Sequence, residues 1–100
     1  MHVISRKRLK EAAEKHSDLA APLDAWYRIA TKAKWANLAD VRKTWASADS
    51  VEQYTVFNIK GNDYRLVAAV DFEKGIVWIK WIGSHADYDR IDVTEVKHER

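Results

Sequence analysis

The sequence contains no cysteine, and no apolar run approaches the roughly 18 residues that a transmembrane helix needs. The lack of cysteine excludes disulfide bonds, thiolate nucleophiles and cysteine-rich zinc sites, and it is typical of a reducing compartment. Residues 1–10 carry charges where a secretory signal peptide would have an apolar run. We therefore expect a soluble, cytoplasmic protein with no membrane partner.

Several catalytic motifs are also absent. The sequence has no phosphate-binding glycine loop, no nucleophile elbow and no paired-carboxylate pattern. His85, Asp87 and Asp89 are close enough in sequence to suggest metal ligands. The other histidines stand at no ligand spacing: His2, His16 and His98. The sequence therefore predicts no metal and no cofactor.

The residues that are present indicate one ordered domain over residues 1–100. They are 47% apolar and include eleven aromatic side chains, which suffices for one modest core. The charge is uneven, because residues 1–45 hold ten Lys or Arg and five Asp or Glu, whereas residues 46–100 hold seven and ten. The basic first half could lie along RNA phosphates, or it could be a solvated helix face.

Apolar residues recur at helical spacing through the first half of the chain. Helices are predicted over residues 6–16, from Ser17 or Asp18 onward, and through residue 45, with Ser5 and Asn37 as N-caps of the first and third. The residues expected to face the core are Leu9, Ala12, Ala13, Leu19, Leu23, Trp26, Ile29, Ala30, Ala33, Leu38, Val41 and Trp45.

The second half changes to the alternation of strands. Strands are predicted over residues 54–59, 64–72 and 76–82, and residues 2–4 favour a short edge strand. The pairs Gly61-Asn62 and Lys74-Gly75 are typical of two-residue hairpin turns. The expected fold class is α+β, with two to three N-terminal helices packed on one face of a small antiparallel sheet.

These turns also predict how the strands pair. The first turn pairs Asn58 with Arg65, and the second pairs Phe72 with Val77 and Ala68 with Trp81. One face of the sheet, the apolar face, must then be covered by the helices: it holds Phe57, Ile59, Tyr64, Leu66, Ala68, Val70, Phe72, Val77, Ile79 and Trp81. The opposite, mixed face holds Val56, Asn58, Arg65, Val67, Ala69, Asp71, Trp78 and Lys80.

Arg65 is the central candidate on the mixed face, with Asn58 beside it and Ser84 roughly opposite. A guanidinium there offers a fork of donors to a phosphate. The alternative is a salt bridge to Asp63 or Asp89 that only solvates the sheet.

The segment after the third strand adds proton-transfer groups. Ser84 and Asp87 have the spacing of a capping box, which predicts a helical turn. That turn would put His85 and Asp89 on one side, with Tyr88 adjacent. A histidine beside a carboxylate exchanges a proton near pH 7, and a tyrosine can donate a proton or stack on a base. The alternative is a surface turn with an ordinary exposed histidine.

Two lysines and one tryptophan complete the candidate site. Lys60, in the first turn, and Lys80, on the mixed face, could neutralise phosphate charge, although lysines at such places are also common solubility devices. Trp78 could touch a base, whereas three other tryptophans are expected in the core: Trp26, Trp45 and Trp81. Such a set of side chains can cut RNA without a metal by helping a 2′-hydroxyl attack its own phosphate.

At these residues the sequence resembles the HigB toxins of type II toxin–antitoxin systems, within the RelE-like group. The resemblance is carried by residues 56–67, by Ile79-Lys80 and by Ser84-His85-x-x-Tyr88-Asp89, and the start at residues 2–5 is similar too. It implies a ribosome-dependent mRNA endonuclease that is neutralised by a HigA-like antitoxin with a helix-turn-helix fold. The complex would then bind operator DNA through the antitoxin. This sequence departs from the usual pattern at Ser84, where a threonine is more familiar, and at Ala86-Asp87.

By position in that resemblance, Arg65 stabilises phosphate charge, His85 is the base or acid, and Tyr88 is the acid or a stacking group. The residues assigned to catalysis are Arg65, His85, Tyr88 and Lys80, and those assigned to RNA binding are Asn58, Lys60, Asp89 and Trp78. Two other hypotheses remain: a non-catalytic RNA- or ribosome-binding inhibitor of translation, and a plain protein-interaction domain. The presence of His85 favours the nuclease, because a pure binder needs no proton-transfer group.

Overall fold

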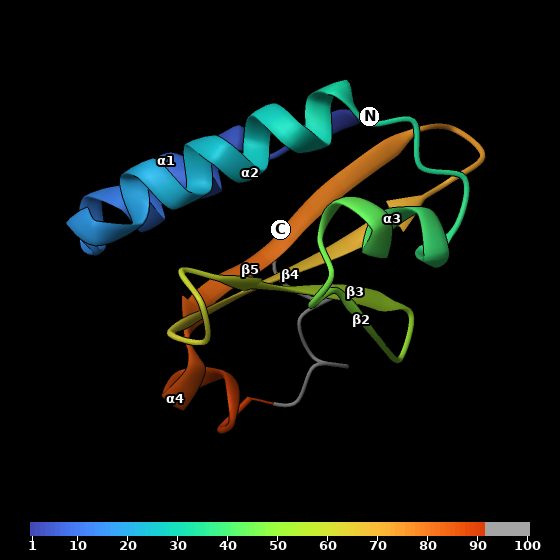
Figure 1. The fold of residues 1–100 in the computed structure, drawn as a ribbon. Helices are drawn as coiled ribbons and strands as arrows, with labels where there is room; N and C mark the ends of the chain where they lie inside the picture. The colour runs from blue at the N-terminus through green and yellow to red at the C-terminus, as the bar shows by residue number, and fades with distance from the viewer. Residues whose placement is uncertain (92–100) are drawn as a thin grey trace.

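The computed structural model describes residues 1–91, which form a five-stranded sheet with helices (Figure 1). The elements in chain order are β1 (His2–Ile4), α1 (Arg6–Lys15), a 3-10 turn η1 (Ser17–Leu19), α2 (Ala20–Lys32), α3 (Leu38–Thr44), β2 (Asp49–Val51), β3 (Tyr54–Ile59), β4 (Tyr64–Asp71), β5 (Ile76–Ser84) and α4 (His85–Tyr88). The strand order is β1-β5-β4-β3-β2, and only the β1–β5 pair is parallel. The α+β class is confirmed.

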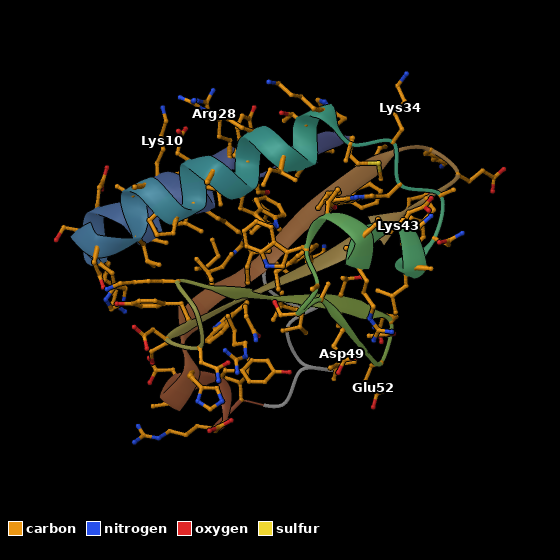
Figure 2. The ribbon with its side chains drawn as sticks, in the orientation of Figure 1. Lys10, Arg28, Lys34, Lys43, Asp49 and Glu52 are labelled. Carbon is orange, nitrogen blue, oxygen red and sulfur yellow. The ribbon has the colours of Figure 1, made fainter. Side chains whose placement is uncertain are left out.

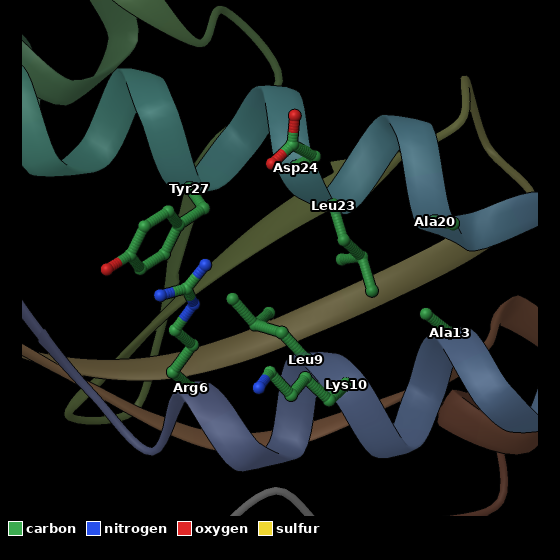
Figure 3. Close-up of a pocket in the computed structure, with 8 residues that line it drawn as sticks. All are labelled: Arg6, Leu9, Lys10, Ala13, Ala20, Leu23, Asp24 and Tyr27. Atoms are coloured by element: carbon green, nitrogen blue, oxygen red, sulfur yellow. The ribbon is translucent and has the colours of Figure 1, made fainter.

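The main core joins α1, α2 and α3 to the sheet. Figure 1 shows α1 and α2 side by side on one side of the sheet, while α4 follows directly on the C-terminal end of β5. The fully buried Trp26 of α2 meets Phe57 of β3 edge to face, with ring centroids 5.3 Å apart. Between α1 and α2, Leu9 and Leu23 point toward each other (Figure 3). The predicted apolar stripe therefore faces the core with two exceptions. Ile29 is 36% exposed, and Ala13 lines a pocket between α1 and α2.

The helix starts follow the sequence in part. Asn37 caps α3 as predicted, because its side chain accepts a hydrogen bond from the Asp40 amide at 2.9 Å. The prediction for Ser5 is wrong, since its side chain makes no capping hydrogen bond. The second helical segment begins at Ser17, as predicted, first as the 3-10 turn η1 and from Ala20 as α2.

The first hairpin has the predicted register, with Asn58 opposite Arg65. The positive φ angles lie at Lys60 (53°) and Gly61 (64°), one position earlier than the predicted Gly61-Asn62 pair. The turn closes with the Asp63 amide donating to the Lys60 carbonyl at 3.2 Å. Arg65 is therefore on the mixed face, as expected from strand alternation.

The predicted register of the second hairpin is wrong by two residues. The turn spans four residues, 72–75, and is closed by the Gly75 amide donating to the Asp71 carbonyl at 2.9 Å, so Val70 pairs with Val77. A shift of two residues leaves every side chain on its expected face.

A β-bulge then changes the face of one tryptophan. The pairing passes from Ala68–Ile79 to Val67–Trp81, which leaves Lys80 as the extra residue of β5. Beyond the bulge the alternation of β5 is reversed relative to β4. Trp81 consequently does not enter the helix-covered core, and it packs instead in a second cluster with Val67 on the mixed face. The prediction of Trp81 as a main-core residue is wrong.

Strand β2 was not expected from the sequence. It pairs with β3 across a turn in which Glu52 has a φ of 56°. Its three residues, Asp-Ser-Val, carry too little alternation to signal a strand.

Candidate functional site

Arg65 is held on the mixed face by neutral oxygen atoms. Its Nη1 donates to the backbone carbonyls of Asn62 and Tyr64 at 3.1 and 3.2 Å, and its Nη2 donates to Oδ1 of Asn62 at 3.3 Å. The same Asn62 oxygen accepts a hydrogen bond from the side-chain Nδ2 of Asn58 at 3.2 Å. Within residues 1–91, no carboxylate pairs with Arg65, so the alternative of a salt bridge to Asp63 or Asp89 is wrong. The neutral oxygens of Asn62 and Tyr64 therefore orient the guanidinium without neutralising its positive charge.

The helical turn after β5 forms as predicted. The Ser84 hydroxyl accepts a hydrogen bond from the Asp87 amide at 3.1 Å, which caps α4. The His85 amide donates to the Asp63 carbonyl at 2.9 Å, which ties α4 to the turn that precedes Arg65. Ser84 itself lies opposite Tyr64 rather than Arg65, whose partner in β5 is Gly83.

His85 and Asp89 are brought together across one turn of this helix. The His85 Nε2 lies 3.7 Å from Oδ1 of Asp89, and the two side chains are 47% and 61% exposed. The imidazole is therefore open to solvent and to a substrate, and the Asp89 carboxylate lies on the Nε2 side of the ring.

Tyr88 connects this turn to Arg65. The Arg65 guanidinium carbon lies 6.0 Å from the centre of the Tyr88 ring, and the ring is partly buried. Burial raises the pKa of the Tyr88 hydroxyl above its usual value, while the positive charge of Arg65 acts in the opposite direction. The hydroxyl is thus protonated near neutral pH and available as a donor.

The remaining candidates are not gathered at the same point. The Lys60 ammonium lies 2.7 Å from the carboxylate of Asp18, which also accepts a bond from the Tyr64 hydroxyl at 3.1 Å. Trp78 and Lys80 stand five and three residues before Gly83, which is about 16 and 10 Å along a strand. The structure therefore brings Arg65, Asn58 and Tyr88 together and separates Lys60, Lys80 and Trp78 from them.

Two residues of this region were not recognised in the sequence. Trp81 packs against Tyr88 with ring centroids 6.1 Å apart. A Cβ atom at Gly83 would lie 2.6 Å from the Trp81 indole, so the ring rests directly on the strand at this glycine. A glycine two residues after a tryptophan in a strand is a signal for such close packing.

Two further observations concern residues 1–91 alone. None of the helices there has the length and apolar character needed to cross a membrane. In that part of the chain, no group of three or more histidine, aspartate or glutamate side chains could hold a metal ion, and His98 lies outside it.

Comparisons with known proteins identify the family. A family model for the HigB toxin, described as a RelE-like toxic component of a toxin–antitoxin system, matches residues 19–91. The chain is 33% identical over 92 residues to the "mRNA interferase toxin HigB" of Escherichia coli strain K12, covering 89% of this chain and 88% of that protein. It is 27% identical over 94 residues, with 91% of each chain covered, to the "mRNA interferase HigB" of E. coli O6:H1. The chain therefore belongs to the HigB family of RelE-like toxins.

Proposed function

We propose that this chain is a ribosome-dependent messenger-RNA endonuclease, the toxin of a type II toxin–antitoxin pair. Membership of the HigB family and the mRNA interferase names of its relatives support the activity. The observation that carries the proposal is the pairing of Arg65 with Tyr88 beside the exposed His85–Asp89 pair. A cation and two proton-transfer groups at one end of a sheet suit metal-independent cleavage of RNA.

Arg65 stabilises the charge that develops on the phosphate. Its three hydrogen bonds to neutral oxygens fix the plane of the guanidinium before substrate arrives. Because the described residues place no carboxylate on it, its charge remains available for the phosphate oxygens. Asn58 acts as a positioning residue, since it holds the Asn62 side chain that accepts from Arg65.

His85 and Tyr88 move the protons. One of them accepts the proton of the 2′-hydroxyl, whose oxygen then bonds to the adjacent phosphorus. The bond from phosphorus to the 5′-oxygen breaks, and that oxygen takes a proton from the other group. Asp89, 3.7 Å from the His85 ring, orients the imidazole. Because its raised pKa keeps the Tyr88 hydroxyl protonated near neutral pH, Tyr88 is the group that holds a proton to donate and His85 is the group that accepts one.

The other candidates contribute to RNA binding at a distance from the reacting phosphate. Lys80 makes no ion pair within residues 1–91, so its ammonium is available to a neighbouring phosphate. Trp78 offers a partly exposed ring on the mixed face. Lys60 reaches RNA only by exchanging the Asp18 carboxylate for a phosphate.

The biological setting is part of the proposal. The protein acts in the cytoplasm on messages held by the ribosome, and a HigA-like antitoxin neutralises it and brings the pair to operator DNA. Such an antitoxin must prevent access to Arg65 or to the ribosome.

Induced expression in a bacterium tests the proposal. The unmodified chain should arrest growth with messages cut inside the reading frame, and Arg65→Ala or His85→Ala should relieve the arrest while the variants remain folded. Purified protein should cut ribosome-bound message well and naked RNA poorly. Growth arrest with intact messages would instead indicate the non-catalytic inhibitor, and absence of arrest would indicate an interaction domain.

A further inference from the structure

A groove with a volume of about 310 Å³ lies between the end of α1, the end of β5 and α4. Trp81 lines it from β5, and Lys15 and His16 line it from the end of α1. Asp87 and Arg90 line it from α4 and the residues that follow. A second groove, of about 210 Å³, also contains Lys15 and Trp81 and extends along α1.

We propose that this groove binds one nucleotide of single-stranded RNA next to the phosphate that is cut. The base stacks on Trp81, and the backbone phosphate lies between Lys15 and Arg90. The proposal rests on the proposed function, which it deepens by naming where the message continues beyond Arg65. The volume is at the lower end of the range of small-ligand sites, which fits a single nucleotide rather than a folded partner.

The charges of the groove favour a phosphate. Lys15 and Arg90 are both exposed, and neither forms an ion pair with any residue of 1–91. Asp87 is the acidic residue among those that line the groove, so the two cations leave it with a positive balance. The backbone amide of Asp87 donates to the Ser84 hydroxyl, and this cap fixes α4, and with it Asp87, relative to β5.

The Trp81 ring has the placement of a stacking platform. It is only partly buried and lines both grooves, although it belongs to the cluster on the mixed face. The close approach of its indole to Gly83 and its contact with Tyr88 hold the ring in one orientation. A rigid aromatic ring beside unpaired cations is the arrangement with which proteins bind single-stranded nucleic acid.

The groove is continuous with the proposed catalytic residues. The centres of the Tyr88 and Trp81 rings are 6.1 Å apart. The guanidinium carbon of Arg65 lies 6.0 Å from the centre of the Tyr88 ring. Gly83, on which the indole rests, is the strand partner of Arg65. Tyr88 therefore links the guanidinium proposed to bind the reacting phosphate with the ring proposed to stack on the base.

The test uses a fluorescently labelled RNA hexanucleotide with 2′-O-methyl groups, which cannot be cut because its 2′-oxygens cannot attack. Its binding to the purified chain is followed by anisotropy. Trp81→Leu should weaken binding by about 5- to 100-fold, whereas Trp81→Phe should retain most of it. Lys15→Gln should weaken binding and lower the slope of log K against log salt by about 0.7.

Lys10→Gln is the matched control. Lys10 lies on the same helix, but its side chain points away from the sheet (Figure 2) and lines the pocket between α1 and α2 (Figure 3). The same loss of charge there should leave binding unchanged. Lys15 is an exposed residue outside the core, so its variant remains informative even where Trp81→Leu fails to fold. The proposal is overturned if the unmodified chain, Trp81→Phe and Lys15→Gln bind the hexanucleotide with equal affinity. It is also overturned if the unmodified chain shows no saturable binding.

The same variants separate this proposal from the proposed function. If ribosome-bound messages are still cut and the variants bind the hexanucleotide as tightly as the unmodified chain does, the RNA-binding groove is refuted while the proposed nuclease activity stands. If the unmodified chain cuts no message but the hexanucleotide binds with the expected ranking, the groove stands and the nuclease is refuted. A groove made for an acidic protein segment would leave all hexanucleotide affinities equal, and this too overturns the proposal.

Discussion

Replacing Gly83 by alanine should destabilise the domain, although alanine normally stabilises a strand relative to glycine. Gly83 lies in β5 opposite Arg65, and a Cβ atom built there lies 2.6 Å from Cη2 and Cζ2 of Trp81. Atoms at that distance overlap, so either the indole or the strand must move. The displaced ring is the one that packs against Tyr88.

The expected loss follows from two opposing effects. Removing the backbone freedom of glycine in the unfolded chain stabilises by about 0.4–1 kcal/mol where the native backbone suits alanine. Forcing an extra methyl group into packed side chains costs about 1–3 kcal/mol. The clash outweighs the entropy gain, so we expect a net loss of about 1–2 kcal/mol. For a domain of this size, that loss lowers the melting temperature by roughly 4–16 °C.

A double-mutant cycle with Trp81→Leu isolates the cause. Urea unfolding of the four proteins gives the free energy of unfolding of each. Leucine is too short to reach Gly83, so in the Trp81→Leu background the alanine should cost nothing or stabilise by about 0.4–1 kcal/mol. Gly61→Ala is the control, because no atom beyond the glycine and its chain neighbours lies within 4 Å of its Cβ position. Its φ of +64° makes the alanine cost about 1–2 kcal/mol in both backgrounds.

Two results would refute this reasoning. If Gly83→Ala costs the same with and without the indole, the clash does not involve Trp81. If Gly83→Ala is as stable as the unmodified chain, the indole moves aside freely and is not held against Tyr88.

Arg65→Ala should reduce message cleavage by about 10²- to 10³-fold with little change in melting temperature. Asn62→Ala should reduce cleavage less, because it removes only the side chain that orients the guanidinium. Equal cleavage by the unmodified chain and both variants would contradict this. Trp26→Ala should destabilise the domain by roughly 3–5 kcal/mol, and Trp26→Phe by far less. The buried Nε1 of Trp26 has no hydrogen-bond partner among the described residues, and phenylalanine removes that unpaired N–H group. Similar losses for the two variants in urea unfolding would refute this prediction. The hydrogen bond from Lys60 holds the pKa of the Asp18 carboxyl below its usual value, so the stability that this pair contributes is present above about pH 4 and is lost as the pH falls through the lowered pKa. The difference in unfolding free energy between the unmodified chain and Asp18→Asn should therefore shrink from about pH 6 to about pH 2.5, and a constant difference would exclude the pair as its source.

Part of the candidate site could be predicted from the sequence because it depends on near neighbours. The Ser84 cap and the approach of His85 to Asp89 follow from spacings of three and four residues in one helical turn. The face of Arg65 follows from strand alternation and from a turn only a few residues away. What holds Arg65 was not predicted, because the Asn62 contacts depend on the conformation of the turn rather than on its length.

Local patterns in the sequence thus determined the helices, the three longer strands, the first hairpin and the α+β class, because each depends on residues within one turn or one strand. Only the tertiary structure decided the four-residue second turn, strand β2 and the bulge at Lys80. A bulge adds one residue to one strand of a pair and reverses the alternation beyond it, and no local pattern in this sequence marks that residue. The bulge turned Trp81 away from the main core and set it against Tyr88, which in turn contacts Arg65. The spacing of Trp81 and Gly83 signals close packing of the indole on the strand, but not the face of the sheet on which it lies.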